Sequence, residues 1–180
     1  MLSGLYPQST GVLSNRTDIR KLRPGTVSLP QRFKDSGYWT ARVGKMFHNE
    51  RTNPGNSAWN ENPDRFKNDE LPIVAKARKA FEAKHGRIRP TNRKSWLALL
   101  NQLSTQTRGQ KRPGYGPSGL RDEQHKDGKN ARQVAEWLEK KPFGAQPFFI
   151  ACGIQKPHVP FLAPNKYFDM YPRKDLNFVP

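Results

Sequence analysis

Two segments far apart in the sequence repeat one plan, and this repetition limits the folds that the chain can adopt. Each segment is expected to form a helix, a short loop and a strand, followed by a loop that carries a lysine and a histidine. The first covers residues 28–48 and the second residues 130–158. Helices that alternate with strands are typical of an α/β layer fold, in which ligands bind beyond the carboxyl ends of the strands. The sequence therefore predicts the α/β class, with the two loops as candidate site segments.

The first segment carries signals for both a helix and a strand. Ser28 can cap a helix at its N-terminus, and Pro30 falls in the first turn, where its missing N–H group costs nothing. Gly37 is expected to end this helix. The run YWTARVGKMF, residues 38–47, then predicts a short strand that ends at Gly44.

The second segment begins at Asn130 with the run NARQVAEWLEKK, whose apolar residues lie at helical spacing. Pro142 is expected to end this helix. The following run QPFFIACGI, residues 146–154, predicts a buried strand. The apolar residues that support the helix are Ala131, Val134, Trp137 and Leu138.

Residues 51–128, between the two segments, are basic and poor in periodic patterns, and we interpret them as a loop-rich insert. Two helices are expected within it, over Pro72–Lys84 and Arg93–Leu103. Residues 108–130 combine glycines with charged residues and predict a mobile loop. The apolar residues expected on one side of the first of these helices are Ile73, Ala77 and Phe81.

The charge of the chain restricts its partners more than its fold. The 180 residues carry a formal net charge of +17, so the surface attracts polyanions such as nucleic acid, anionic lipid and sulfated or phosphorylated polymers. The hydrophobic share of 34% predicts a loop-rich domain or part of a larger one. The single cysteine, Cys152, excludes an internal disulfide framework and a cysteine-rich metal site. No run approaches the roughly 20 apolar residues of a membrane span, and the first residues lack a signal-peptide pattern.

Four residues in the two loops are candidates for a site. Lys45 can neutralise a bound anion, and His48 can move a proton near neutral pH. In the run KPHVP, residues 156–160, two prolines fix backbone angles and so hold His158 in a preset direction. Lys156 accompanies this histidine. For both loops the alternative is a solvated surface turn whose lysine and histidine have no catalytic or binding role.

Three other features have a structural interpretation. His85 and His125 lie among polar, lysine-rich neighbours and are expected to be exposed. Cys152 follows an apolar run on the second strand and is expected to be a small core residue rather than a nucleophile. The run SLPQR, residues 28–32, has the form Ser-x-Pro-x-Arg, which can signal a modified nucleophile in one hydrolase family. The helix start explains the same residues without chemistry.

Taken in order, three runs of the sequence resemble the sulfatase family, and more narrowly its iduronate-2-sulfatase branch. The resemblance covers residues 1–48 and 127–180, and its most specific part is the phrase KPHVPF in the right order after VGKMFH. It implies an alkaline-phosphatase-like α/β fold with a mixed sheet flanked by helices, of which this chain holds an incomplete part. The three runs are MLSGLYPQSTGV, SLPQRFKDSGYWTARVGKMFH and PFFIACGIQKPHVPFLAPNKYFDMYP.

The resemblance also implies a site. The family uses a calcium ion and a formylglycine, made from the first residue of a Cys/Ser-x-Pro-x-Arg motif, whose hydrated aldehyde attacks sulfur. Carried over, Lys45 would bind sulfate oxygens, and His48 would contact the formylglycine hydroxyl and assist sulfate release. His158 would bind the sulfate near its bridging oxygen and help to protonate the leaving sugar alcohol. Lys156 receives no chemical step.

The resemblance places the nucleophile and the calcium ligands outside this sequence. The family's counterpart of Met1–Gly4 follows the nucleophile motif by a few residues, and no Asp-Asp pair for calcium occurs here. We therefore expect residues 1–180 to be an internal fragment of a sulfatase catalytic domain that is inactive alone. A full-length member of the family would be periplasmic, secreted or lysosomal.

Two alternative functions stay open. A small basic protein could bind nucleic acid or sulfated glycan through its charge, with an affinity that falls steeply as salt rises. A degenerate sulfatase could instead act as a noncatalytic structural or regulatory partner. Hydrolysis of a sulfate ester by the native product would exclude both alternatives.

Overall fold

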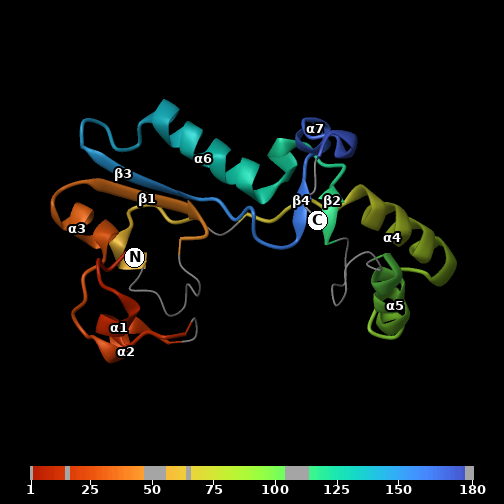
Figure 1. Ribbon diagram of the computed structural model, residues 1–180, viewed down its shortest axis with the longest axis horizontal. Coiled ribbons are helices and arrows are strands. Elements are labelled where there is room, and N and C mark those ends of the chain that lie inside the picture. Colours follow the sequence, from red (N-terminus) through yellow and green to blue (C-terminus); the bar gives the residue numbers. More distant parts are fainter. Residues whose placement is uncertain (1, 15–16, 47–55, 64–65, 104–113, 177–180) are drawn as a thin grey trace. The chain divides into compact units, whose positions relative to one another are not determined.

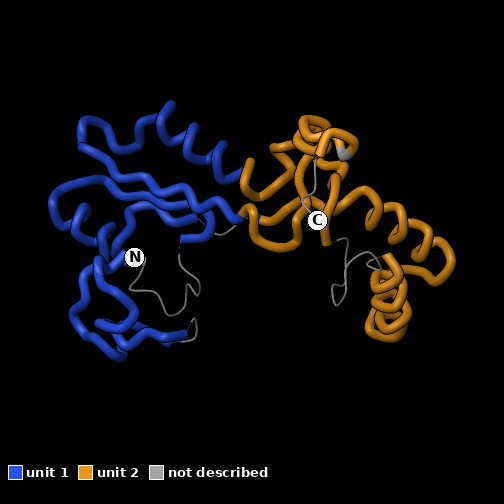
Figure 2. Tube along the Cα trace, in the orientation of Figure 1, with its two compact units in different colours: residues 1–66, 129–155 blue, residues 67–128, 156–180 orange. Residues whose placement is uncertain are grey.

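The computed structural model describes residues 2–14, 17–46, 56–63, 66–103 and 114–176 (Figure 1). Helices are interspersed with strands along the chain, and both strand pairs among the described residues are parallel, so the expected α/β class is confirmed. The chain divides into two compact units (Figure 2). The first unit is Met1–Phe66 with Lys129–Gln155, and the second is Lys67–Gly128 with Lys156–Pro180.

The first unit is built on two parallel strands. β1 (Trp39–Gly44) pairs with β3 (Phe148–Gly153), and the register places Gly44 opposite Gly153. Both strands lie where the sequence predicts them. Every residue of β1 is buried, because other parts of the unit cover both faces of the strand.

Aromatic residues fill one face of this strand pair. The ring of Trp39 lies 5.5 Å from that of Phe143 and 6.0 Å from that of Trp137, measured between centroids. Trp137 comes from α6 (Lys126–Lys140), which runs along β3 (Figure 1). Large buried rings contribute much of the apolar area of a small core, so this cluster holds the helix on the sheet.

The opposite face of β1 contacts the segment around η2 (Asn56–Ala58). The hydroxyl of Thr40 donates a hydrogen bond to the carbonyl oxygen of Ala58 over 2.9 Å, and both residues are buried. The rings of Trp59 and Phe149 stack at 6.0 Å between centroids. The polar side chain on this face is therefore buried with a hydrogen-bond partner, as burial requires.

The helix before β1 starts and ends as predicted. α3 (Leu29–Asp35) begins at Ser28, whose hydroxyl accepts a hydrogen bond from the backbone N–H of Gln31 over 3.4 Å. Gly37 follows the helix with a φ of +84°, a conformation that favours glycine. The structural interpretation of SLPQR as a helix start is confirmed. The helices that precede α3 in the chain are α1 (Pro7–Thr10) and α2 (Ile19–Leu22).

Two glycines bring the carboxyl ends of β1 and β3 together. A Cβ atom on Gly44, whose φ is +75°, would lie 2.3 Å from the carbonyl oxygen of Gly153 and 2.4 Å from Nδ2 of Asn130. A Cβ atom on Gly153 would lie 2.4 Å from the backbone nitrogen of Lys45. Asn130, from α6, donates from Nδ2 to the Gly153 carbonyl oxygen over 3.1 Å and is 3% exposed. Glycine at both positions is what allows these backbones and the amide to meet.

The second unit contains two helices that pack against each other. α4 (Pro72–His85) and α5 (Arg93–Leu103) lie over the ranges predicted for them. The rings of Phe81 and Trp96 join the two helices, with centroids 5.5 Å apart. The buried apolar residues of this unit are Leu71, Val74, Phe81, Trp96, Leu100, Leu120 and Leu162.

The predicted face of α4 is partly wrong. Ile73, expected on the apolar side, is 49% exposed, whereas Val74 is 5% exposed. Val74 lies seven residues before Phe81, which is two helical turns, and both point into the same core. The helix therefore buries the face that carries Val74 and Phe81 and leaves Ile73 exposed.

The prediction of a loop over residues 108–130 is wrong for the part that the structure describes. β2 (Tyr115–Pro117) pairs in parallel with β4 (Phe161–Ala163), a partner that follows much later in the chain. α6 begins at Lys126 rather than at Asn130. Residues 104–113 lie outside the described part. The remaining elements of the unit are η3 (Asp122–Gln124), α7 (Asn165–Asp169) and η4 (Arg173–Asp175).

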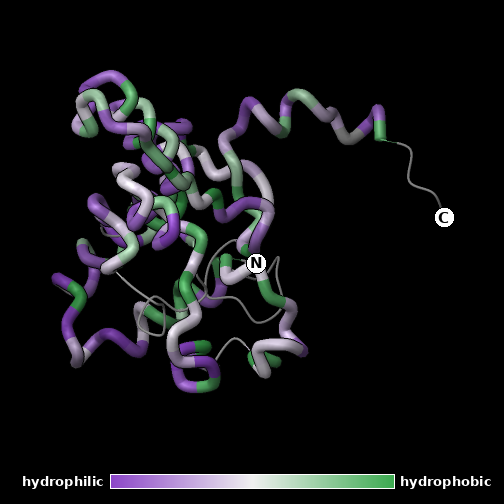
Figure 3. The backbone as a smooth tube through the Cα atoms, turned by 90° about the vertical axis from the view of Figure 1, so that its left-hand side faces the viewer, coloured by the Kyte–Doolittle hydropathy of each residue, from purple (hydrophilic) through white to green (hydrophobic). Residues whose placement is uncertain are grey.

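Hydrophobic stretches are short along the chain and alternate with hydrophilic ones (Figure 3). Among the described helices, none has both the length and the apolar composition that crossing a membrane requires. The interpretation of residues 51–128 as an insert in a larger domain stays a prediction.

Gly44→Ala should destabilise the protein more than Gly37→Ala. Both residues have a positive φ, so each substitution should cost about 1–2 kcal/mol from backbone strain. Only at Gly44 would the added methyl group also meet backbone and Asn130 atoms, because a Cβ at Gly37 meets nothing within 4 Å. We expect a further loss of about 1–3 kcal/mol in the free energy of unfolding, measured by urea denaturation. Equal losses in the two variants would show that the close approach is not required.

Candidate functional site

Lys45 lies directly after β1, at the end where the two strands of the first unit meet. Its backbone N–H donates to the carbonyl oxygen of Gly153 over 3.2 Å, which fixes the start of the loop. The residue is half-buried. Its ammonium group forms no ion pair or hydrogen bond with the residues that the structure describes, so the charge is available to an anion.

His48, the second candidate in this loop, lies outside the described residues. Its role stays a prediction that rests on the sequence. The described part of the loop, Lys45 and Met46, shows only that the chain leaves β1 beside the end of β3.

His158 is exposed, and one of its ring nitrogens has a backbone partner. Nδ1 lies 2.7 Å from the carbonyl oxygen of Val159. Because a carbonyl oxygen can only accept, Nδ1 must carry the proton, and in the neutral ring Nε2 then has a free lone pair. Nε2 has no partner among the described residues, so it is the atom that can exchange a proton with a ligand.

Lys156 turns its side chain back over the loop that carries His158. Nζ donates to the carbonyl oxygen of His158 over 3.3 Å and also to that of Pro160. Burial, and then the charge of Lys126, lower the pKa of Lys156, while the carboxylate of Asp127 opposes this shift. The ammonium is therefore committed to backbone oxygens of its own loop.

Asp127 is a residue that the sequence analysis did not single out. Its Oδ2 accepts a hydrogen bond from the backbone N–H of Lys156 over 2.9 Å. An acidic residue in the first turn of a helix is a usual stabilising feature and could have drawn attention to it. Because the sequence predicts that this helix starts at Asn130, Asp127 is not expected in its first turn.

His125 is buried, and the expectation that it is exposed is wrong. The residue is 7% exposed, and Nε2 of its ring lies 2.8 Å from the hydroxyl oxygen of Ser118, a residue that is 6% exposed. The same hydroxyl accepts the backbone N–H of Leu120 over 3.1 Å. This pair of residues resembles a nucleophile and its base, but its burial excludes a substrate, so we interpret it as a structural contact.

Of the other expectations for single residues, one is confirmed and one is wrong. His85 is exposed, as predicted, although its ring also contacts Phe81 at 4.7 Å between centroids. Cys152 is exposed, so the expectation of a core residue is wrong. Along β3 the side chains alternate, and Ala151 and Gly153 take the buried positions on either side of it.

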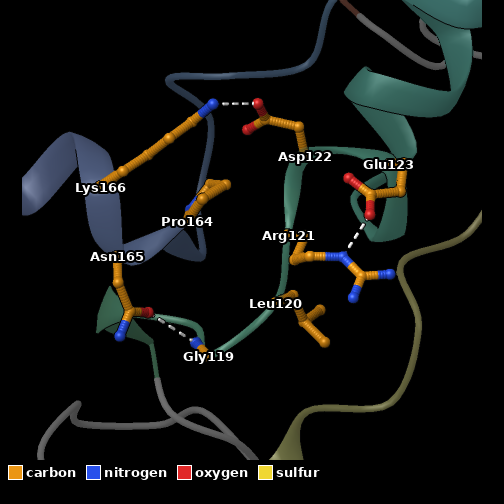
Figure 4. Close-up of a pocket in the computed structure, with 8 residues that line it drawn as sticks. All are labelled: Gly119, Leu120, Arg121, Asp122, Glu123, Pro164, Asn165 and Lys166. Carbon is orange, nitrogen blue, oxygen red and sulfur yellow. Dashed lines mark hydrogen bonds and ion pairs between the residues drawn. The ribbon is translucent and has the colours of Figure 1, made fainter.

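A cavity of about 400 Å³ in the second unit is lined by charged residues (Figure 4). Lys166 pairs with Asp122, and Arg121 pairs with Glu123. The ammonium of Lys166 lowers the pKa of the Asp122 carboxyl by donating to it. Since two cations face two anions, this cavity offers little net charge to select a ligand. None of the described candidate residues of the two loops lines it.

No cluster of His, Cys, Asp or Glu among the described residues fits the calcium ion that the resemblance implies. Within residues 2–14, 17–46, 56–63, 66–103 and 114–176, no group of three or more His, Cys, Asp or Glu side chains could hold a metal ion. We therefore assign no step of a reaction to a metal held by these residues.

Comparison with known proteins gives one consistent family. A family model described as Sulfatase matches residues 1–178. A protein named Sulfatase from Formosa agariphila is 27% identical over 192 residues, which cover 100% of this chain and 32% of that protein. Proteins named Iduronate 2-sulfatase from Homo sapiens and Mus musculus are 26% and 28% identical, and the matches cover 99% of this chain and 29% of each protein. The chain thus spans about a third of the length of the curated relatives it matches.

Acid should destabilise the protein through His125. Burial, and then the charge of Lys156, lower the pKa of its ring below the usual 6.5, while Asp122 and Asp127 oppose this shift. The unfolded chain binds a proton near pH 6.5 and the folded protein only at lower pH. The stability is therefore fully present above pH 6.5 and is lost as the pH falls towards the pKa of the folded protein.

This pH dependence can be measured as the difference in unfolding free energy between about pH 7.5 and about pH 5.5. We expect a smaller difference in His125→Gln than in the unsubstituted protein. His85→Gln, which changes an exposed histidine, should leave the difference unchanged. An unchanged difference in His125→Gln would contradict the prediction.

Proposed function

The chain belongs to the sulfatase family, and we propose that it forms part of a sulfuric ester hydrolase acting on sulfated sugars. The relatives named Iduronate 2-sulfatase, together with the runs VGKMFH and KPHVPF, favour an iduronate-2-sulfatase-like enzyme. Because the chain spans about a third of their length, we propose that it is one portion of a longer catalytic domain.

The observation that carries the proposal is the match of the sulfatase family model to residues 1–178. Two described side chains, each considered within its own unit, suit the chemistry of that family. Lys45 follows β1 with an ammonium group that is uncommitted among the described residues, and His158, on the loop after β3, has no partner at Nε2 among them. An uncommitted cation and an imidazole with a free Nε2 are suited to a sulfate ester.

The proposed chemistry assigns one task to each candidate residue. Lys45 binds sulfate oxygens and stabilises the negative charge that the transferring group carries. His158, when protonated at Nε2, donates that proton to the bridging oxygen as the sulfur–oxygen bond breaks, so the sugar leaves as an alcohol. For His48, which lies outside the described residues, the resemblance implies contact with the formylglycine hydroxyl and assistance in the release of sulfate.

The nucleophile and the metal belong to the same proposal. In such an enzyme a formylglycine would provide the nucleophile toward sulfur, and a calcium ion would provide positive charge at the sulfate. In this sequence only Ser28–Arg32 has the form of the formylglycine motif, and Ser28 caps α3. We therefore propose that residues outside this sequence provide both groups, and that residues 1–180 alone are inactive.

A basic surface favours binding of polyanions as a second function. Residues 76–94 carry eight lysines and arginines but a single acidic residue, Glu82. Arg78 pairs with Glu70, and the other cations form no ion pair with described residues. Such residues could bind a sulfated polymer as part of an enzyme or, in a noncatalytic protein, as the binding site itself. The eight are Lys76, Arg78, Lys79, Lys84, Arg87, Arg89, Arg93 and Lys94.

The native product should release sulfate from sulfated monosaccharides, and alanine at Lys45 or His158 should prevent it. We expect each substitution to lower kcat about 100-fold or more, because each removes a group that acts on charge or protons in the transition state. Sulfate release would be followed by ion chromatography. Lys21→Ala and His85→Ala, which change an exposed lysine and an exposed histidine elsewhere, should retain activity.

Intact mass and N-terminal peptide mapping of the native product would accompany the assay. A species far heavier than 20.6 kDa that contains a Cys/Ser-x-Pro-x-Arg peptide before MLSG agrees with the proposal. Full activity in the Lys45 or His158 variant, or no hydrolysis by such a heavier species, would overturn it.

Polyanion binding should depend on residues 76–94. The double variant Arg87→Glu/Arg89→Glu should elute from immobilised heparin at lower salt than the unsubstituted protein, because it reverses two exposed charges. The matched variant Lys21→Glu/Arg23→Glu makes the same change in net charge on the first unit. Equal elution of the two variants would show that net charge, rather than this surface, governs binding.

A further inference from the structure

We propose that Lys156 and Asp127 are positioning residues that fix the direction and the tautomer of His158. The inference rests on the proposed function, because it explains how a proton donor on an exposed loop is held in place. Neither residue would touch the substrate. Asp127 attaches the loop, Lys156 holds its backbone, and the hydrogen bond of the ring to Val159 then sets the tautomer.

Asp127 attaches the loop at its first residue. Its Oδ2 accepts the backbone N–H of Lys156 over 2.9 Å, and the two residues are 29 positions apart in the sequence. Asp127 lies in the first turn of α6, and the adjacent Lys126 donates its backbone N–H to Oδ1 of Asn68 over 2.8 Å. The carboxylate is thus held by a helix whose first residue is itself hydrogen-bonded to Asn68. Its hydrogen bond to Lys156 can therefore restrict the position of the loop.

Lys156 then braces the backbone on both sides of Val159. Its Nζ donates to the carbonyl oxygens of His158 and Pro160, the residues immediately before and after. An ammonium group has three donors, so one side chain can hold both oxygens at once. Holding these two carbonyls restricts rotation of the peptide units around Val159, whose own carbonyl lies between them in the chain.

The carbonyl of Val159 finally sets the ring of His158. Nδ1 donates to it over 2.7 Å, which places the proton of the neutral ring on Nδ1 and leaves Nε2 for the ligand. A hydrogen bond to one ring nitrogen is the usual means by which a protein selects the tautomer and the direction of the other. Loss of the brace should let this carbonyl turn away and release the ring.

The competing role for Lys156 is direct binding of sulfate, and the geometry argues against it. The side chain is half-buried and its Nζ already donates to two carbonyl oxygens. Burial also lowers the pKa of the ammonium, which disfavours its charged form. A sulfate-binding lysine would have to give up both bonds, whereas the ammonium of Lys45 is uncommitted among the described residues.

The two roles predict different kinetics in the native product. If Lys156 positions His158, Lys156→Met should lower kcat roughly 10- to 100-fold with KM within about twofold, because the proton donor is misplaced while binding remains. Asp127→Ala should act in the same way. Lys156→Arg and Asp127→Asn keep a donor and an acceptor at these positions and should restore part of kcat.

A spectroscopic measurement tests the same inference without activity. In protein labelled with ¹⁵N at histidine, long-range ¹H–¹⁵N spectra distinguish a ring protonated at Nδ1 from one protonated at Nε2. We expect His158 to be protonated at Nδ1 in the neutral ring of the unsubstituted protein. In Lys156→Met and Asp127→Ala the Nε2-protonated form should appear, while Lys166→Met and Asp169→Ala, controls in the same unit, should keep the Nδ1 form.

The outcomes separate this inference from the proposed function. An Nδ1-protonated His158 in Lys156→Met, or a raised KM with unchanged kcat, would overturn the positioning role even in an active sulfatase. If the protein hydrolyses no sulfate ester but the variants show the tautomer change, the proposed function is overturned, whereas the positioning of His158 by Lys156 and Asp127 is supported. If Lys156→Met fails to fold, the tautomer in Asp127→Asn and Lys156→Arg decides, because both should keep the Nδ1 form that Asp127→Ala loses.

Discussion

The close approach of two backbones at the ends of β1 and β3 is the constraint on which the first unit depends. Gly44 and Gly153 face each other there, and the amide of Asn130 donates to the Gly153 carbonyl oxygen from α6. Any side chain at either glycine would occupy space that already holds backbone atoms. The contact fixes the register of the strands, the position of the helix along them, and the point from which Lys45 leaves the sheet.

The candidate residues of the two loops are held in place by different means. Lys45 takes its position from backbone pairing at the strand ends, and its charge stays uncommitted among the described residues. His158 lies on the loop between β3 and β4 and depends on side chains, first the carboxylate of Asp127 and then the ammonium of Lys156. A cation that attracts an anion tolerates some freedom, since its field acts over distance. A proton donor, the role proposed for His158, must meet one atom in one direction, and the hydrogen bonds of Asp127 and Lys156 would supply that direction.

Local signals in the sequence were sufficient for the elements that local contacts decide. Ser28 and Gly37 mark both ends of α3, and the strands β1 and β3 follow from their apolar runs. The burial of His125 could not be predicted, because its partner Ser118 lies in a segment without periodicity. The pairing of β2 with β4 could not be predicted either, because each strand is short and the two lie far apart in the chain. The candidate loop residues can be identified from their position after predicted strands. The contact of Asp127 with Lys156 depends on the fold, because the two residues are 29 positions apart.

The contact between the two glycines also limits how this family of sequences can diverge. Most crowded positions in a core can be relieved by a smaller side chain nearby, so two changes compensate for each other. A side chain at Gly153 would meet backbone atoms of Lys45, and one at Gly44 would meet the Gly153 carbonyl oxygen. Backbone atoms cannot be made smaller by substitution. No second-site change in a side chain can therefore rescue either position fully, and the two glycines should persist together even where the residues around them have drifted.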